Sequence, residues 1–190
     1  MKLILLLFWA HLFLMTASSQ AQKATEVKLS FFSEAPFENI YAESSKGVSA
    51  IDIGSRLVYF KVSIQSFQFE KKLMQEHFNE NYLESEKYPY AEFKGKIEEP
   101  FDLTAPGVYA VHVSGKLTIH NVTRDYRVAG EIAVRGDRLS ATAEFPVSIA
   151  EHKVKIPRLL VKNIAEVVLV KVRASYPYSA KLEEETTVSP

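Results

Sequence analysis

Apolar and polar residues alternate along most of this 190-residue sequence, and this pattern constrains the fold more than any other feature. Successive side chains of a β-strand point to opposite faces, so an apolar residue at every second position indicates one buried and one solvated face. Strands of this kind are typical of antiparallel sheets. The alternating segments lie near residues 27–32, 40–53, 58–64, 91–97, 109–119, 122–134, 139–149 and 168–172.

Short turn sequences join several of these segments. Gly136 and Asp137 connect two of them, and His120 and Asn121 connect two others, with residue types that favour tight hairpins. About eight strands joined in this way are compatible with an up-and-down barrel or with a sandwich of two sheets. The alternation alone does not distinguish these two architectures.

One segment departs from the alternation. Met74, Phe78 and Tyr82 recur at every fourth residue, which places them on one face of an amphipathic helix of about three turns over residues 70–83. The Tyr88-Pro89 pair that follows prevents a helix from continuing. We expect this helix to lie across an open end of the β structure.

The N-terminal segment has the features of a secretory signal. Lys2 precedes an apolar run, and small residues that suit cleavage follow it. The run of about 13 residues is shorter than the ~20 that a membrane-spanning helix needs. We expect residues 1–21 to be removed, residues 22–178 to form one domain, and residues 179–190 to be a flexible polar tail. The protein is then periplasmic or secreted, with no transmembrane segment after cleavage.

Charge and residue content argue against several functions. The 23 basic and 23 acidic side chains argue against nucleic acid as a partner, because phosphate binding requires a clustered positive potential. The absence of Cys excludes disulfides, thiolate metal sites and a lipoprotein anchor. His112 and His120 stand about 27 Å apart along one strand, too far to share a metal. We predict no catalytic residues, no metal and no cofactor, and hence a protein that is not an enzyme.

Two charged segments have both an ordinary and a functional interpretation. Glu98 and Glu99 have the character of solvated loop charges. The segment from Glu151 to Lys162 interleaves cations with apolar residues, which fits either a solvated crossover or an amphipathic flap at a cavity mouth. In the second interpretation a lipid headgroup or a membrane surface meets three cations, Lys153, Lys155 and Arg158.

Three stretches of the sequence resemble the YceI family of exported bacterial lipid-binding proteins. LMQEHFNENYLESEKYPYAEFKG, residues 73–95, resembles a family helix that leads into Tyr-Pro-x-Ala-x-Phe. LTIHNVTRDYRV, residues 117–128, resembles a family hairpin in which Asn121 takes the place of the usual Gly, as a turn with positive φ allows. Residues 145–164 form a third, weaker stretch. The three stretches occur in the family's order and span most of the chain after residue 21.

The resemblance implies an all-β, eight-stranded antiparallel lipocalin-like barrel that holds a polyisoprenoid-type or similar amphiphilic lipid in its lumen. Met74, Phe78 and Tyr82 then cap one end. The candidate lumen residues are the inward members of the alternating segments: Phe60, Val62, Ile64, Ala91, Phe93, Tyr109, Val111, Val113, Tyr126, Val128, Ala141, Ala143, Phe145 and Val170. The alternative is an exported β-sandwich for adhesion or assembly that binds no lipid. A homodimer is compatible with either.

Overall fold

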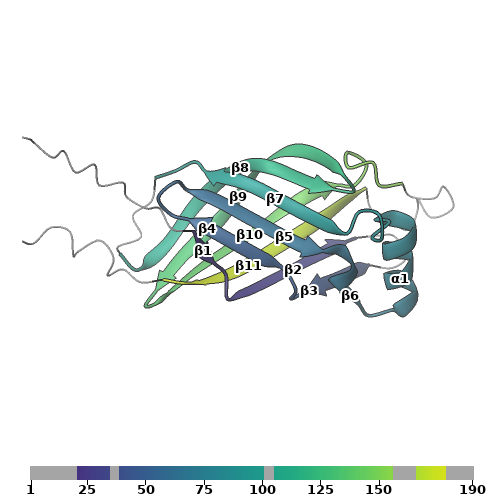
Figure 1. Ribbon diagram of the computed structural model, residues 1–190, viewed down its shortest axis with the longest axis horizontal. Coiled ribbons are helices and arrows are strands. Elements are labelled where there is room, and N and C mark those ends of the chain that lie inside the picture. The colour runs from purple at the N-terminus through teal and green to yellow at the C-terminus, as the bar shows by residue number, and fades with distance from the viewer. Residues whose placement is uncertain (1–20, 35–38, 101–104, 156–165, 179–190) are drawn as a thin grey trace, which may run out of the picture.

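The computed structural model describes residues 21–34, 39–100, 105–155 and 166–178 (Figure 1). They form one antiparallel sheet that curls round on itself, with a helical segment across one end. The expected signal peptide and polar tail lie outside the described residues. The elements are β1 (Gln22–Lys23), β2 (Glu26–Ser33), β3 (Ile40–Ser44), β4 (Val48–Asp52), β5 (Leu57–Ser63), η1 (Ile64–Ser66), β6 (Gln68–Phe69), α1 (Lys72–His77), η2 (Phe78–Tyr82), β7 (Tyr90–Ile97), β8 (Gly107–Ile119), β9 (Val122–Arg135), β10 (Arg138–Ser148) and β11 (Val167–Pro177).

The strand order is β1-β4-β5-β7-β8-β9-β10-β11-β2-β3-β6, and all neighbours are antiparallel. From β7 to β11 each strand pairs with the next one along the chain, as the turn sequences predict. β11 then pairs with β2, which brings the last strand beside the beginning of the chain. The described residues therefore form one curled sheet, and the alternative of a two-sheet sandwich is wrong.

The structure has eleven strands where the sequence predicted eight, because the expected strand over residues 40–53 is divided into β3 and β4, and the short strands β1 and β6 lie outside the expected segments. β1 pairs with β4, and β2 pairs with β3, in the same register. The pairing is broken between β1 and β2, and again between β3 and β4. At the first break Ala24 N–H donates to Ser49 O at 2.9 Å and Thr25 N–H donates to Ser175 O at 2.8 Å. These two bonds link the β4 and β11 sides of the sheet. The third break is the turn η1 between β5 and β6. Such breaks let a strand change partners where a sheet bends sharply.

The β8–β9 hairpin closes through two residues with positive φ. His120 has φ 51° and Asn121 has φ 58°, while Ile119 and Val122 form the last strand pair. Two consecutive residues of this conformation suit the right-handed twist of the flanking strands. Asn tolerates positive φ better than most residues, which explains its presence in the turn.

The helical segment is shorter than predicted. It comprises α1 and η2, a single π-helical turn, and so covers residues 72–82 of the expected 70–83. Leu83 N–H donates to Phe78 O at 2.9 Å, which closes the wide turn. Figure 1 shows this segment across the end of the sheet where β5 finishes and β7 begins, and we call this the helix end.

The opposite end of the sheet is a packed core. The Tyr176 side chain is 1% exposed, and its hydroxyl lies 2.6 Å from Ser49 Oγ, which donates to Tyr59 O at 2.8 Å. Burial raises the pKa of Tyr176 to about 12. Around it pack other buried side chains, namely Val27, Ile51, Ile97, Val134, Leu139 and Ala174.

Candidate ligand-binding cavity

A cavity of about 600 Å³ occupies the interior of the curled sheet on the side of the helix end. Its volume lies within the range of about 300–1,000 Å³ that is usual for small-molecule sites. Inward-facing residues of β2, β5 and β7 to β11 form its wall, and the helical segment covers it. Most of the lining side chains are apolar, so the cavity suits an apolar ligand.

Most of the candidate lumen residues line this cavity. They are Phe60, Val62, Ile64, Ala91, Phe93, Val111, Val113, Val128, Ala141, Ala143, Phe145 and Val170. Tyr109 and Tyr126 do not line it. Tyr109 packs against the core cluster, and its hydroxyl donates to Ala105 O at 2.7 Å. Tyr126 contacts the buried His152 instead.

The helical segment covers the cavity through an aromatic cluster. Met74, Phe78 and Tyr82 all line the cavity, as expected for one helix face. The Phe78 ring lies between the rings of Phe31, Phe67 and Phe69, with centroid distances of 5.4, 5.9 and 5.0 Å. No residue of α1 or η2 is itself fully buried. The segment is therefore a cover fixed mainly through these aromatic contacts.

Three members of this aromatic cluster, Phe31, Phe67 and Phe69, were not predicted from the sequence. Phe31 precedes Phe32, so the alternation did not tell which of the two points inward. Phe67 directly follows η1 and Phe69 lies in the two-residue strand β6, so neither belongs to a stretch long enough to show a periodicity. Their spacing of two residues was the one available signal.

The cavity is closed at its inner end. Ile51, Ile97 and Tyr176 line it there and are each 1% exposed. Val134 and Leu139, which are also buried, belong to the same core but do not line the cavity. We call Ile51, Ile97 and Tyr176 the cavity floor.

His152 is the buried histidine of the cavity wall, with 0% of its surface exposed. Its Nδ1 lies 3.0 Å from Val122 O, and its Nε2 lies 3.2 Å from the Tyr126 hydroxyl. Because a carbonyl only accepts, Nδ1 carries the proton and the neutral Nε2 accepts from Tyr126. Burial lowers the pKa of His152 below its usual value, so the imidazole stays neutral near pH 7.

We expect the stability of the protein to fall as the pH decreases below about 6.5, the ordinary pKa of histidine. The unfolded chain binds a proton at His152 in that range, whereas the folded chain resists it. The slope from this one group is at most about 1.4 kcal/mol per pH unit. Urea unfolding between about pH 5 and 7.5 measures it. The variant His152→Gln should flatten the curve. A slope equal to that of the wild type would contradict the assignment.

The structure describes two of the three cations that were predicted at the cavity mouth. Lys153 and Lys155 are exposed in the loop after β10 and do not line the cavity. Arg158 lies outside the described residues. Their role at a headgroup stays a prediction.

A hydrogen bond joins the exit of the helical segment to the β8–β9 turn. His120 Nε2 lies 2.7 Å from Glu84 Oε2, and Tyr88 packs edge-on against the His120 ring with 4.4 Å between centroids. The hydrogen bond with His120 lowers the pKa of Glu84. The contact fixes the rim of the cavity on the β7–β9 side.

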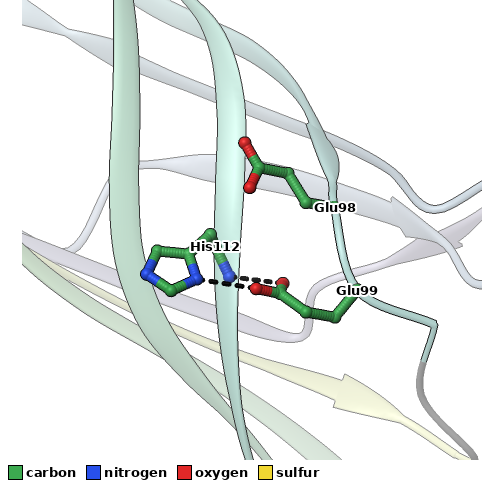
Figure 2. A group of neighbouring side chains, drawn as sticks. All are labelled: Glu98, Glu99 and His112. Carbon is green, nitrogen blue, oxygen red and sulfur yellow. Dashed lines mark hydrogen bonds and ion pairs between the residues drawn. The ribbon is translucent and has the colours of Figure 1, made fainter.

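Glu98, Glu99 and His112 come together on the outer face (Figure 2), whereas the sequence predicted only that Glu98 and Glu99 are solvated loop charges. Glu99 accepts from His112 N–H at 2.7 Å and contacts His112 Nδ1 at 2.6 Å. The backbone bond from His112, followed by the side-chain bond, lowers the pKa of Glu99 to about 2. The β7–β8 register continues beyond the Ile97–Val113 pair, where Glu98 N–H donates to His112 O at 2.9 Å, and this brings the three residues together.

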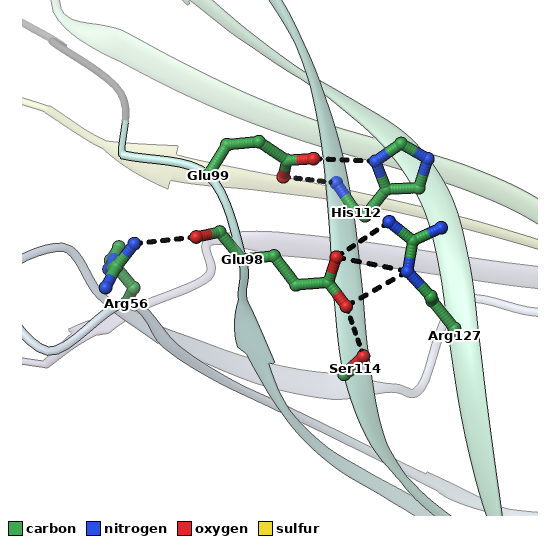
Figure 3. Close-up of polar contacts among 6 residues, drawn as sticks. All are labelled: Arg56, Glu98, Glu99, His112, Ser114 and Arg127. Carbon is green, nitrogen blue, oxygen red and sulfur yellow. Dashed lines mark hydrogen bonds and ion pairs between the residues drawn. The ribbon is translucent and has the colours of Figure 1, made fainter.

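The carboxylates of this cluster already have protein partners. Arg127 holds Glu98 through two nitrogens, with Nη2 at 2.8 Å and Nε at 3.1 Å, and Ser114 also donates to it (Figure 3). Arg56 donates to the Glu98 carbonyl at 2.8 Å. The ligand atoms of the three residues lie within 4.8 Å of one another, but a cation there would compete with Arg127. The arrangement fastens the end of β7 to β8 and β9.

Within the part of the chain that the structure describes, no helix is long and apolar enough to cross a membrane.

Comparisons with known proteins identify relatives of this fold. The sequence profile of the YceI-like domain matches residues 13–176. The structure is similar to that of BcnA from Burkholderia cenocepacia, with a TM-score of 0.68 and 17% identity over 78% of this chain and 95% of that one. It is similar to a polyisoprenoid binding domain from Saccharophagus degradans implicated in plant cell wall breakdown, with a TM-score of 0.69 and 15% identity over 84% and 98% of the two chains. A YceI protein of Campylobacter jejuni gives a TM-score of 0.61 and 14% identity over 77% and 89%. Among curated proteins no match was found.

Proposed function

The chain belongs to the YceI-like domain family, and from this premise we propose that it binds a polyisoprenoid-type or similar amphiphilic lipid in the cavity of its sheet. The observation that carries the proposal is the cavity itself, which holds about 600 Å³ between apolar walls. The similar fold of a polyisoprenoid binding domain supports the choice of ligand.

The cavity wall supplies shape and apolar surface. The lumen residues combine small side chains, such as Ala91, Ala141 and Ala143, with large ones, such as Phe60 and Phe93. A chain-like ligand fits along the small side chains and contacts the flanking rings. Each buried methylene group contributes about 0.8 kcal/mol, so a dozen contribute roughly 10 kcal/mol before several kcal/mol are lost on ordering the ligand. Binding therefore requires neither a charge nor a metal.

The same proposal includes export. The signal-like N-terminus predicted from the sequence would deliver the protein to the periplasm or the exterior, where it would sequester a lipid or carry it between membranes. This role requires no catalytic group.

The direct test is to identify what the purified protein contains. Organic extraction followed by mass spectrometry should reveal a lipid, and native mass spectrometry should report its mass together with the number of subunits. Polyprenols added to stripped protein should raise its melting temperature. At a hundredfold excess over Kd the gain is about 2.7 kcal/mol, which corresponds to roughly 5–10 °C for a domain of this size.

A water-soluble polyol of similar length is the matched control and should leave the melting temperature unchanged. Protein that yields no lipid on extraction and gains no stability from any polyprenol would reject the proposal.

A further inference from the structure

Apolar side chains form a row on the outer face of the sheet near the helix end. Pro146 pairs with Leu169, Leu169 with Phe32, and Phe32 with Tyr41, so the four lie side by side across β10, β11, β2 and β3. All four are exposed; Leu169, Phe32 and Tyr41 have 39%, 37% and 50% of their surfaces accessible. We call Pro146, Leu169, Phe32 and Tyr41 the apolar belt. A continuous exposed apolar row is unusual on a sheet surface unless it contacts something.

A row of charged and polar residues follows two residues further from the helix end. It consists of Glu144, Lys171, Ser30 and Glu43, which are again cross-strand neighbours. Lys171 pairs with Glu144 at 3.0 Å, and Lys28 pairs with Glu43 at 2.9 Å. The Tyr41 hydroxyl donates to Glu43 at 2.7 Å, so this side chain spans both rows. We call Glu144, Lys171, Ser30 and Glu43 the charged row.

The two rows have the spacing of a membrane interface. Two residues of a strand correspond to about 7 Å. Elements that lie in the interface of a bilayer bury their apolar face by about 5–10 Å, with polar groups at the level of the headgroups. Tyr is enriched at this depth because its ring is apolar and its hydroxyl is polar. Tyr41 has this orientation if the helix end faces the bilayer.

We propose that the apolar belt docks the protein reversibly on a phospholipid bilayer, with the helix end and the cavity mouth toward the membrane. The two carboxylates of the charged row, Glu144 and Glu43, are paired with Lys171 and Lys28. Such paired charges complement zwitterionic headgroups and require no anionic lipid. The rim at β8 and β9 is polar, with Thr118 against Thr123 and Lys116 against Asp125 at 2.7 Å. The protein therefore docks tilted onto the side of β10, β11, β2 and β3.

The belt is continuous with the strands that form the cavity wall. On the inner face of the same strands Phe31, Val170 and Phe145 line the cavity, one residue from Phe32, Leu169 and Pro146. Docking thus places the cavity beside the source of its ligand. The choice of a bilayer rests in part on the proposed function. The distance between the apolar belt and the charged row, and the ion pairs of the charged row, support it independently.

The first experiment measures co-sedimentation with vesicles of pure phosphatidylcholine. The double variant Phe32→Asp/Leu169→Asp should reduce the partition coefficient at least tenfold. The matched control is Val108→Asp, because Val108 is 56% exposed on the outer face at the other end of the sheet; it should bind as the wild type does. Replacing part of the lipid with phosphatidylglycerol should change binding by less than threefold. Wild-type protein that stays in solution, or equal losses in the two variants, would overturn the proposal.

The second experiment uses tryptophan as a reporter, because Trp9 is the only Trp in the sequence. In a Trp9→Phe background, Phe32→Trp should shift its emission to shorter wavelength when phosphatidylcholine vesicles are added, and Val108→Trp should not. An unshifted Phe32→Trp spectrum would overturn docking. Docking would also be overturned if the wild type were a dimer and the double variant Phe32→Asp/Leu169→Asp a monomer. A second copy of the chain, and not a bilayer, would then cover the apolar belt.

The variant Ala143→Phe separates this proposal from the proposed function. A protein with a filled cavity should still bind vesicles. In the wild type, vesicle binding without any cavity lipid would reject the proposed function and support docking, and cavity binding without vesicle binding would support the proposed function and reject docking.

Discussion

Replacing Ala143 by phenylalanine is expected to abolish lipid binding while the protein remains folded. Ala143 faces the cavity from β10, opposite Gly130 of β9 and Val172 of β11. A phenyl ring at this point occupies the space that a lipid chain requires. We expect Kd to rise at least about a hundredfold, equivalent to roughly 2.7 kcal/mol. Titration with a fluorescent polyprenol analogue measures the change.

The variant Ala129→Phe is the matched control, because Ala129 is exposed on the outer face of β9. It should bind lipid as the wild type does. The stability of Ala143→Phe is a second readout: a ring placed into open space leaves the free energy of unfolding unchanged, whereas overpacking a filled interior lowers it by about 1–3 kcal/mol. Unchanged lipid affinity in a folded Ala143→Phe protein would contradict the cavity as the binding site.

Phe78→Ala should release bound lipid much faster. The Phe78 ring contacts the rings of Phe31, Phe67 and Phe69, and these contacts hold the helical segment over the cavity. Loss of a half-buried aromatic side chain with three such contacts costs about 2–3 kcal/mol. Because no residue of the helical segment is fully buried, most of this cost should ease local opening rather than global unfolding. The dissociation rate should rise roughly 30- to 150-fold.

Stopped-flow transfer of a fluorescent lipid to empty vesicles measures this rate. Glu76→Ala is the control, since Glu76 is an exposed residue of the same helix. If Phe78→Ala lowered the melting temperature strongly but left the dissociation rate unchanged, the helical segment would be a structural element and not a cover over the ligand.

The inward and outward faces of the strands were predictable because the side-chain direction in a strand follows from position alone. Alternation therefore identified Phe60, Val111 and Ala143 as inward-facing, and they line the cavity. Alternation does not report depth along the sheet. Tyr109 has the correct parity but lies in the core at the packed end.

Features that depend on contacts between distant residues were not predictable. The division of the expected strand over residues 40–53 into β3 and β4, and the short strands β1 and β6, accompany the curvature of the whole sheet, which no local pattern encodes. His152 is buried through contacts with Tyr126 and Val122, which precede it by 26 and 30 residues. The contact between Glu99 and His112 depends on the β7–β8 register, and the sequence predicted no turn between these two strands.

Under the proposed function, the cavity floor of Ile51, Ile97 and Tyr176 would determine the order in which lipids exchange. With that end sealed, a bound molecule leaves by the route along which it entered, and an incoming molecule cannot push it out from behind. Emptying therefore precedes refilling in every cycle. The escape rate of the first lipid sets the ceiling on turnover, however concentrated the second one is.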